Sequence, residues 1–185
     1  MISLKSYCGY LSTILGLTPD ALYERQRVLT RSGYLSGAIA GKGPGSGIRA
    51  TPTNVTKLIL STLAADSLSE IDKSTRKLAA VKHSGGKCPV TGETRLYNAL
   101  EKILSTPALA ETMLSVDVRR TDMTVRLRFK RQDDQIVLSE FGTKTLDTGM
   151  ALRITATIPG WGIEVVSSDI EDISAGEPLR WHTPR

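Results

Sequence analysis

The chain has 185 residues and a formal net charge of +5, with 40% hydrophobic, 23% charged and 5% aromatic residues. This composition is typical of an ordinary globular protein of one or two small domains. No apolar run approaches the roughly 20 residues that span a bilayer, and the N-terminus lacks the features of a signal peptide, so a cytoplasmic protein without membrane contact is expected. The distant cysteines Cys8 and Cys88 are expected to be reduced thiols.

The charges are unevenly distributed along the chain. Residues 1–105 carry 14 Lys and Arg against 7 Asp and Glu, whereas residues 106–185 carry 10 against 12. Such asymmetry is expected when one part of a protein faces a polyanion. Chance and the needs of solubility would produce the same numbers, so charge alone leaves both explanations open.

Six helices are predicted in the first 113 residues, because apolar side chains recur there every three or four positions. Their expected ranges are 3–15, 19–32, 51–64, 67–82, 92–104 and 106–113. Gly16 and Gly33 are expected to end the first two helices, and Thr18 is expected to be the N-cap of the second. Pro19 fits the first turn, where a missing N–H costs no helical hydrogen bond.

A hairpin is predicted between the second and third helices. Residues 34–39 and 48–50 are its expected strands. The segment between them, AGKGPGSG, is too rich in glycine to pack and is typical of a flexible hairpin tip. Its basic side chains would then be presented to solvent.

An antiparallel sheet is predicted after residue 116, where the apolar period changes from helical to alternating. The expected strands are 123–130, 136–141, 150–158 and 161–166. Pro159-Gly160 is expected to form the last turn, and the acidic tail from Asp169 is expected to fray. The predicted fold class is therefore α+β, with the helices first and the sheet in the C-terminal part.

Residues 11–35 contain a more specific pattern. In order, it consists of Leu11, Leu15-Gly16-Leu17-Thr18, Leu22, Arg25, Arg27, Leu29 and Gly33-Tyr34-Leu35. The pattern resembles the core of bacterial winged helix-turn-helix regulators, in which Ser or Thr opens the recognition helix and glycine leads into the wing. The resemblance covers about residues 3–55, and the helix at 53–64 would replace the one that normally precedes such a pair.

The resemblance implies an N-terminal winged helix-turn-helix DNA-binding domain over residues 1–66. Residues 67–185 would then form a helical connector and an antiparallel sheet for dimerisation or ligand sensing. Because operator binding commonly uses two-fold symmetric dimers, a homodimer or higher homo-oligomer is expected.

The predicted DNA contacts come from the outer face of the second helix and from the basic residues that follow it. Leu22, Gln26 and Leu29 share the inner face of that helix, with Arg25 at its edge. Arginine can bind guanine bidentately, and a carboxylate can accept a hydrogen bond from cytosine. The residues expected to touch the major groove are Thr18, Asp20, Tyr23, Glu24, Arg27 and Arg31, and those expected at the backbone are Lys42, Arg49 and Lys57. The alternatives are a solvated helix face and a surface loop.

A second basic row lies on a predicted strand. Arg126, Arg128 and Lys130 alternate with apolar residues, with Arg119 and Arg120 upstream. This row would be either a second nucleic-acid surface or, as we expect, a solvent-exposed face balanced by nearby acids. The apolar face behind it must be covered by the helices at 68–113 or by a second copy of the chain.

Other chemistry has little support in the sequence. A nucleotide P-loop is rejected for two reasons. Only three residues, instead of four, lie between Gly37 and Gly41-Lys42, and Gly43 stands where Ser or Thr should bind magnesium. His83 and Cys88 lack the paired spacing of zinc ligands. With two histidines and no GxSxG motif, we predict no catalytic site, metal or cofactor.

The sequence thus predicts a protein that binds double-stranded DNA sequence-specifically, of bacterial or phage origin. It would regulate transcription by occupying promoters and would not be an enzyme. Three alternatives stay open: a DNA-packaging or assembly protein of a phage or mobile element, a protein–protein adaptor on a winged-helix fold, and an enzyme with a site that is not obvious from sequence.

Overall fold

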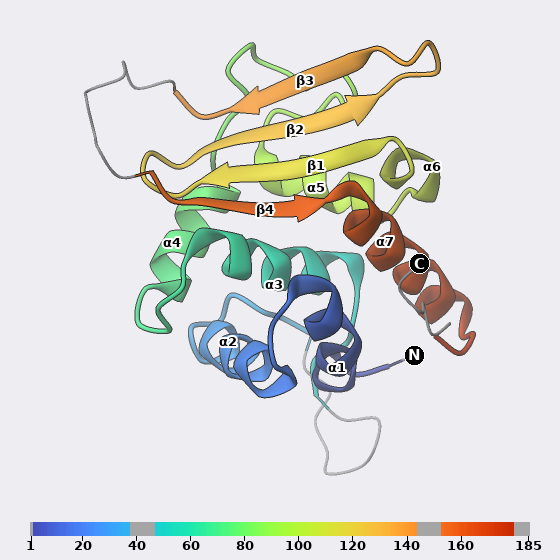
Figure 1. The fold of residues 1–185 in the computed structure, drawn as a ribbon. Helices are drawn as coiled ribbons and strands as arrows, with labels where there is room; N and C mark the ends of the chain where they lie inside the picture. The colour runs from blue at the N-terminus through green and yellow to red at the C-terminus, as the bar shows by residue number, and fades with distance from the viewer. Residues whose placement is uncertain (1, 38–46, 144–152, 180–185) are drawn as a thin grey trace.

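The computed structural model describes residues 2–37, 47–143 and 153–179, which form seven helices and four strands (Figure 1). The helices are α1 (Leu4–Leu15), α2 (Pro19–Arg31), α3 (Pro52–Ala64), α4 (Ile71–Ala79), α5 (Leu96–Leu104), α6 (Pro107–Ala110) and α7 (Gly160–Ala175). The strands are β1 (Met113–Arg119), β2 (Thr124–Lys130), β3 (Ile136–Phe141) and β4 (Thr155–Pro159). The predicted α+β class is confirmed, with the sheet in the C-terminal part.

The pair formed by α1 and α2 has the predicted turn and caps. Gly16 adopts a left-handed φ of 65°, which a residue without a Cβ tolerates, and it ends α1. The Thr18 hydroxyl accepts a hydrogen bond from the Ala21 N–H and caps α2. After α2, Gly33 again has a positive φ, of 68°. Three residues therefore separate the two helices, as the sequence predicts.

Helix α3 is the central element of the helical part. It packs against α1, α2, α4 and α5, and 9 of its 13 residues are buried. Helix α3 thus packs against both members of the α1–α2 pair. The expected domain boundary after residue 66 falls between α3 and α4, and one hydrophobic cluster extends across it.

Two arginine side chains bind the C-terminal carbonyl groups of α3. Arg25 donates to the carbonyl oxygens of Ser61 and Ala65 at 2.9 and 2.8 Å. Arg120, which follows β1, donates to those of Leu63 and Thr62, both at 2.8 Å. The last turn of a helix leaves its carbonyl groups without helical partners, and these guanidinium groups satisfy them.

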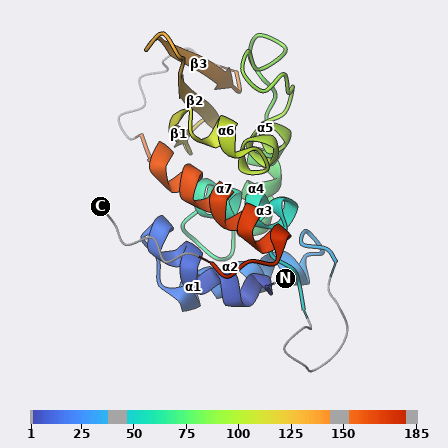
Figure 2. The same cartoon turned by 90° about the vertical axis from the view of Figure 1, so that its right-hand side faces the viewer.

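The four strands form an antiparallel sheet in the order β3-β2-β1-β4. One face is apolar and buried, with Val118 of β1 opposite Val125 on one side and Ala156 on the other. Helices α5, α6 and α7 lie on this side of the sheet, while none of the described helices covers its other face (Figures 1 and 2). The chain's own helices thus cover the apolar face, so a second copy is not needed for that purpose.

The prediction of a returning strand at Trp161–Val166 is wrong, because these residues begin α7. Its buried residues Ile163, Val166, Ile170 and Ile173 follow helical spacing over a longer window than the one that suggested a strand. Pro159-Gly160 is not a turn but the direct passage from β4 into α7. Gly160 is needed there, since a Cβ at this position would lie 1.8 Å from the Met113 carbonyl oxygen.

The prediction that the chain frays from Asp169 is also wrong, because α7 continues to Ala175. The Tyr7 hydroxyl donates to Asp169 Oδ2 at 3.0 Å in a buried position, which joins α1 to α7. Burial raises the pKa of Tyr7 well above its ordinary value, and the Asp169 charge adds to the effect. A charged residue near the end of a sequence can thus be part of the interior.

Other element boundaries differ from the prediction. Strand β1, the central strand next to both β2 and β4, was not predicted as a separate element. Helices α4 and α5 each begin four residues later than expected, since residues 67–70 and 92–95 adopt other conformations. Short apolar runs such as 113–119 fit a helix or a strand equally well.

The predicted wing lies only partly within the described residues. Residues 34–37 are irregular, and Arg49 forms an isolated antiparallel bridge with Ser3, ahead of α1. The Leu4 N–H donates to the Ile48 carbonyl oxygen at 2.7 Å. Residues 38–46, which include Lys42, lie outside the described residues, so the wing stays a prediction.

Candidate nucleic-acid interface and a basic groove

The outer face of α2 is exposed at the end of the molecule opposite β3 (Figure 1). Its inner face packs against α1, α3 and α4. The buried residues are Leu22, Arg25, Gln26 and Leu29, and the exposed or half-buried ones include Asp20, Tyr23, Glu24, Arg27 and Arg31. The structure therefore brings the predicted major-groove residues of α2 onto one accessible surface.

Two contacts organise this surface. Arg27 Nη1 lies 2.7 Å from Glu24 Oε1, and both side chains are 42% exposed. The Lys5 ammonium lies 4.8 Å from the centroid of the Tyr23 ring. Lys5 belongs to α1 and was not predicted to take part. Its position beside Tyr23 could not be read from the spacing within either helix, because it depends on how the two helices cross.

Lys57 does not belong to this surface. Its ammonium donates to the Tyr34 carbonyl oxygen at 2.8 Å and lies 5.0 Å from the centroid of the same tyrosine ring. Burial lowers the pKa of Lys57, and the charge of Arg76 lowers it further against the opposing effect of Glu101. Lys57 instead lines a separate groove. Arg49 is half-buried beside the start of α1.

We call this second feature the basic groove. It is a concave surface of about 380 Å³. Its lining residues are Tyr34, Lys57, Arg76, Ala79, Ala80, Arg95, Tyr97 and Asn98. The groove thus combines three cationic side chains with two tyrosine rings, and it draws on α3, α4, α5 and the segment after α2. Sequence reasoning missed it, because these residues are far apart in the chain.

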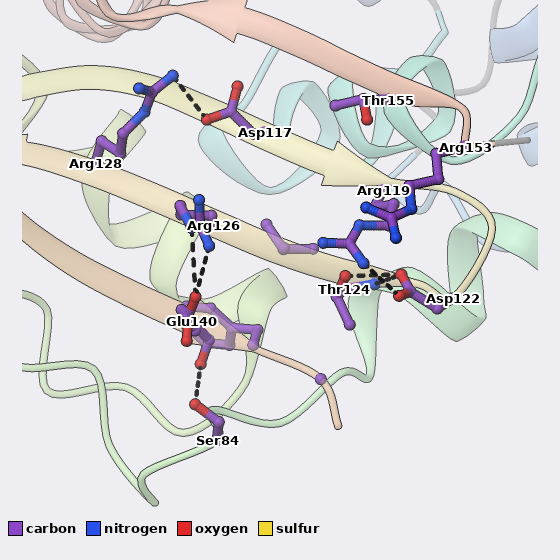
Figure 3. A pocket seen from close by; sticks show the side chains of 13 residues that line it. Ser84, Asp117, Arg119, Asp122, Thr124, Arg126, Arg128, Glu140, Arg153 and Thr155 are labelled. Atoms are coloured by element: carbon purple, nitrogen blue, oxygen red, sulfur yellow. Dashed lines mark hydrogen bonds and ion pairs between the residues drawn. The ribbon is translucent and has the colours of Figure 1, made fainter. Parts of the chain in front are cut away.

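The open face of the sheet is a third polar surface, with a depression of about 470 Å³. Figure 3 shows the side chains that line it. Four of the cations on this face have acidic partners at short distance. The ion pairs are Arg126–Glu140 at 3.0 Å, Arg128–Asp117 at 3.1 Å, Lys130–Asp134 at 2.8 Å and Arg119–Asp122 at 3.1 Å.

Because nearby acids balance these basic side chains, the presence of the basic row can be explained without a second nucleic-acid surface. Asp117 also accepts from the Thr157 hydroxyl at 2.9 Å, and Ser115 accepts from Arg128 at 2.7 Å. Arg120, the remaining member of the predicted row, turns inward to α3. These contacts favour the solvent-exposed polar face that we expected.

The cysteines and histidine of the described chain do not form a metal site. Cys8 and Cys88 are free and buried, and no group of three His, Cys, Asp or Glu side chains could hold an ion within the described ranges. Burial raises the pKa of the Cys8 thiol to about 12. The His83 Nδ1 atom accepts a hydrogen bond from the Gly85 N–H at 3.0 Å, so this nitrogen stabilises the loop that contains it.

None of the helices in the described part of the chain has the length and apolar character needed to cross a membrane. Comparison of the chain with protein-family models, with curated proteins and with solved structures finds no match.

Proposed function

We propose that the protein binds double-stranded DNA sequence-specifically through the outer face of α2 and regulates transcription by occupying promoters. The observation that carries the proposal is the arrangement of α2 itself. One face is held by α1, α3 and α4, and within the described residues the opposite face is accessible and carries the polar side chains of Asp20, Glu24, Arg27 and Arg31. A helix presented in this way, as the second of a closely joined pair, fits the major groove.

The side chains on that face have the chemistry for base readout. The Glu24–Arg27 pair is about half exposed, and such surface pairs contribute only about 0–1 kcal/mol. Exchanging the pair for a bidentate Arg27–guanine contact and a Glu24–cytosine contact therefore costs little. Each good base contact supplies about 1–3 kcal/mol of discrimination. Arg31 and Lys5 would bind the phosphate backbone on either side.

A single helix of this kind reads one short half-site. We therefore propose that the protein acts as a homodimer or higher homo-oligomer, whose paired α2 helices would be spaced to match successive major grooves. The regions away from α2, including the open face of the sheet, are where copies would meet without covering the DNA-reading surface.

The test is a titration of fluorescently labelled duplex DNA of random sequence with the full chain, followed by anisotropy at low and moderate salt. Wild type should bind more weakly as salt rises, because binding at the phosphates releases counterions. The double variant Arg27→Ala/Arg31→Ala should bind at least tenfold more weakly. Its salt slope should be shallower by about 1 for each phosphate that the variant no longer neutralises.

The matched control removes the same charge elsewhere. Lys87→Gln/Arg131→Gln deletes two exposed cations that have no ion pair in the described chain and lie away from α2. This variant should bind DNA within about twofold of wild type, since it leaves the α2 surface in place. The proposal fails if wild type shows no binding at low salt, or if both double variants weaken binding equally. Sequence selectivity is then measured by selection from a randomised duplex pool.

A further inference from the structure

The basic groove brings together side chains from four parts of the chain. Tyr34 follows α2, Lys57 comes from α3, Arg76 from α4, and Arg95 and Tyr97 from the beginning of α5. A volume of about 380 Å³ is within the range of sites that bind small molecules. The groove is separate from the outer face of α2.

Two of the cations are held in position around one ring. The Lys57 ammonium and the Arg76 guanidinium carbon lie 5.0 and 4.6 Å from the centroid of the Tyr34 ring. Arg76 also donates to the Ser32 carbonyl oxygen at 2.9 Å and to Asp72 at 2.8 Å. Two like charges are thus kept close together by contacts with their surroundings. An anion bound between them would relieve their repulsion.

The third cation has no acidic partner among the described residues. Arg95 is the N-cap residue of α5, is exposed, and makes no side-chain hydrogen bond or ion pair in the part of the chain that the structure describes. Two carboxylates that interact with other residues of the groove are already engaged. Glu101 accepts from the Thr53 hydroxyl at 2.6 Å and from the Tyr97 hydroxyl at 2.8 Å, and Asp72 is paired with Arg76.

The groove therefore presents more positive than negative charge and has no acid among its lining residues. Guanidinium and ammonium groups are the side chains that bind phosphate most effectively, by forked and point-charge contacts respectively. The exposed side chain of Asn98 and the half-buried ring of Tyr97 add a hydrogen-bonding group and an apolar face at the same place.

We propose that the basic groove binds a small phosphorylated molecule of nucleotide size, with its phosphate held by Lys57, Arg76 and Arg95 and its remainder against Tyr97. This proposal is independent of DNA binding through α2, because the two surfaces share none of these residues.

The test is isothermal titration calorimetry of the full chain with pyrophosphate and with adenosine monophosphate at low ionic strength. We expect saturable binding of at least one probe to wild type. Arg95→Gln should weaken it at least tenfold, because the variant cannot form a charged hydrogen bond to phosphate, while every contact of the fold is kept. Arg131→Gln removes the same charge at the far end of the sheet and should change affinity less than twofold.

A second measurement reports on the groove directly. Nuclear magnetic resonance titration of the Lys57 side chain should show its pKa rising when the probe binds, since a bound phosphate stabilises the ammonium form. The proposal is overturned if neither probe binds, if Arg95→Gln and Arg131→Gln have equal effects, or if the Lys57 pKa does not move. It is also overturned if Arg95→Gln weakens only duplex DNA, which would make the groove a backbone contact.

Discussion

Replacing Arg25, a residue that is only 6% exposed, with methionine removes a guanidinium group that joins α2 to the end of α3. The aliphatic part of the side chain is kept, so the change isolates the polar contacts. In the native protein Arg25 donates to the carbonyl oxygens of Ser61, Ala65 and Asp66 at 2.9, 2.8 and 3.2 Å. The first two acceptors belong to buried residues at the end of α3.

The expected cost follows from those hydrogen bonds. A hydrogen bond to a charged group contributes about 1.5–3 kcal/mol, so two such bonds amount to about 3–6 kcal/mol. Part of this is offset, because methionine does not suffer the desolvation of a buried guanidinium group, which lowers the pKa of Arg25 in the folded state. We expect Arg25→Met to lower the free energy of unfolding by about 3 kcal/mol. For a chain of this size the melting temperature would fall by roughly 6–12 °C.

The assay is urea unfolding followed by far-ultraviolet circular dichroism, with linear extrapolation to water. Arg31→Met is the matched control, since Arg31 lies on the same helix but is exposed, and it should change the free energy of unfolding by less than about 0.5 kcal/mol. A decrease below about 1 kcal/mol for Arg25→Met, or an equal decrease for both variants, would refute the capping role of Arg25.

Two further predictions concern the sheet and its surroundings. Gly160→Ala should destabilise the protein by about 3 kcal/mol or more, because the added Cβ would meet the Met113 carbonyl oxygen at 1.8 Å. Gly9→Ala, in an uncrowded position of α1, should instead be neutral or stabilising by up to about 1 kcal/mol in the same urea experiment. Burial lowers the pKa of His83 below its ordinary value of 6.5, so the unfolded chain takes up this proton first as the pH falls. The stabilisation from neutral His83 should therefore be fully present above pH 6.5 and be lost as the pH falls through the lower folded pKa. His83→Gln should flatten the dependence of the free energy of unfolding on pH between pH 7.5 and 5.5. An unchanged dependence in the variant would contradict this assignment.

The local sequence pattern was sufficient to place an element where the element is long or has clear capping and turn residues at its ends. The α1–α2 pair has glycine after each helix and a threonine cap between them, so its limits could be placed within one or two residues. Strand β3 was predicted with its observed bounds, because its short apolar run is bordered by turn residues on one side and its last residue is followed by glycine. The exposed face of α2, and with it most of the candidate interface, followed from helical geometry alone.

Pattern failed where a short segment was compatible with two structures. The start of α7 alternates like a strand, and only its packing against α1, β1 and β4 makes the helical alternative the stable one. The expected end of the ordered chain at Asp169 failed for a related reason. An acidic residue is normally solvated, but here its partner is Tyr7, 162 positions away in the sequence.

The α+β class, the helix pair and the outward-facing residues of α2 could all be predicted before folding was considered, because they depend on residues a few positions apart. The roles of the basic side chains could not, since they depend on contacts between distant segments. Arg25 and Arg120 cap α3, and Lys57 joins Arg76 and Arg95 in the basic groove. In the sequence each of these residues is simply a cation, and its immediate neighbours do not show which distant segment it will meet. What separates a buried cap from a free binding group is which distant carbonyl or ring the fold brings within reach.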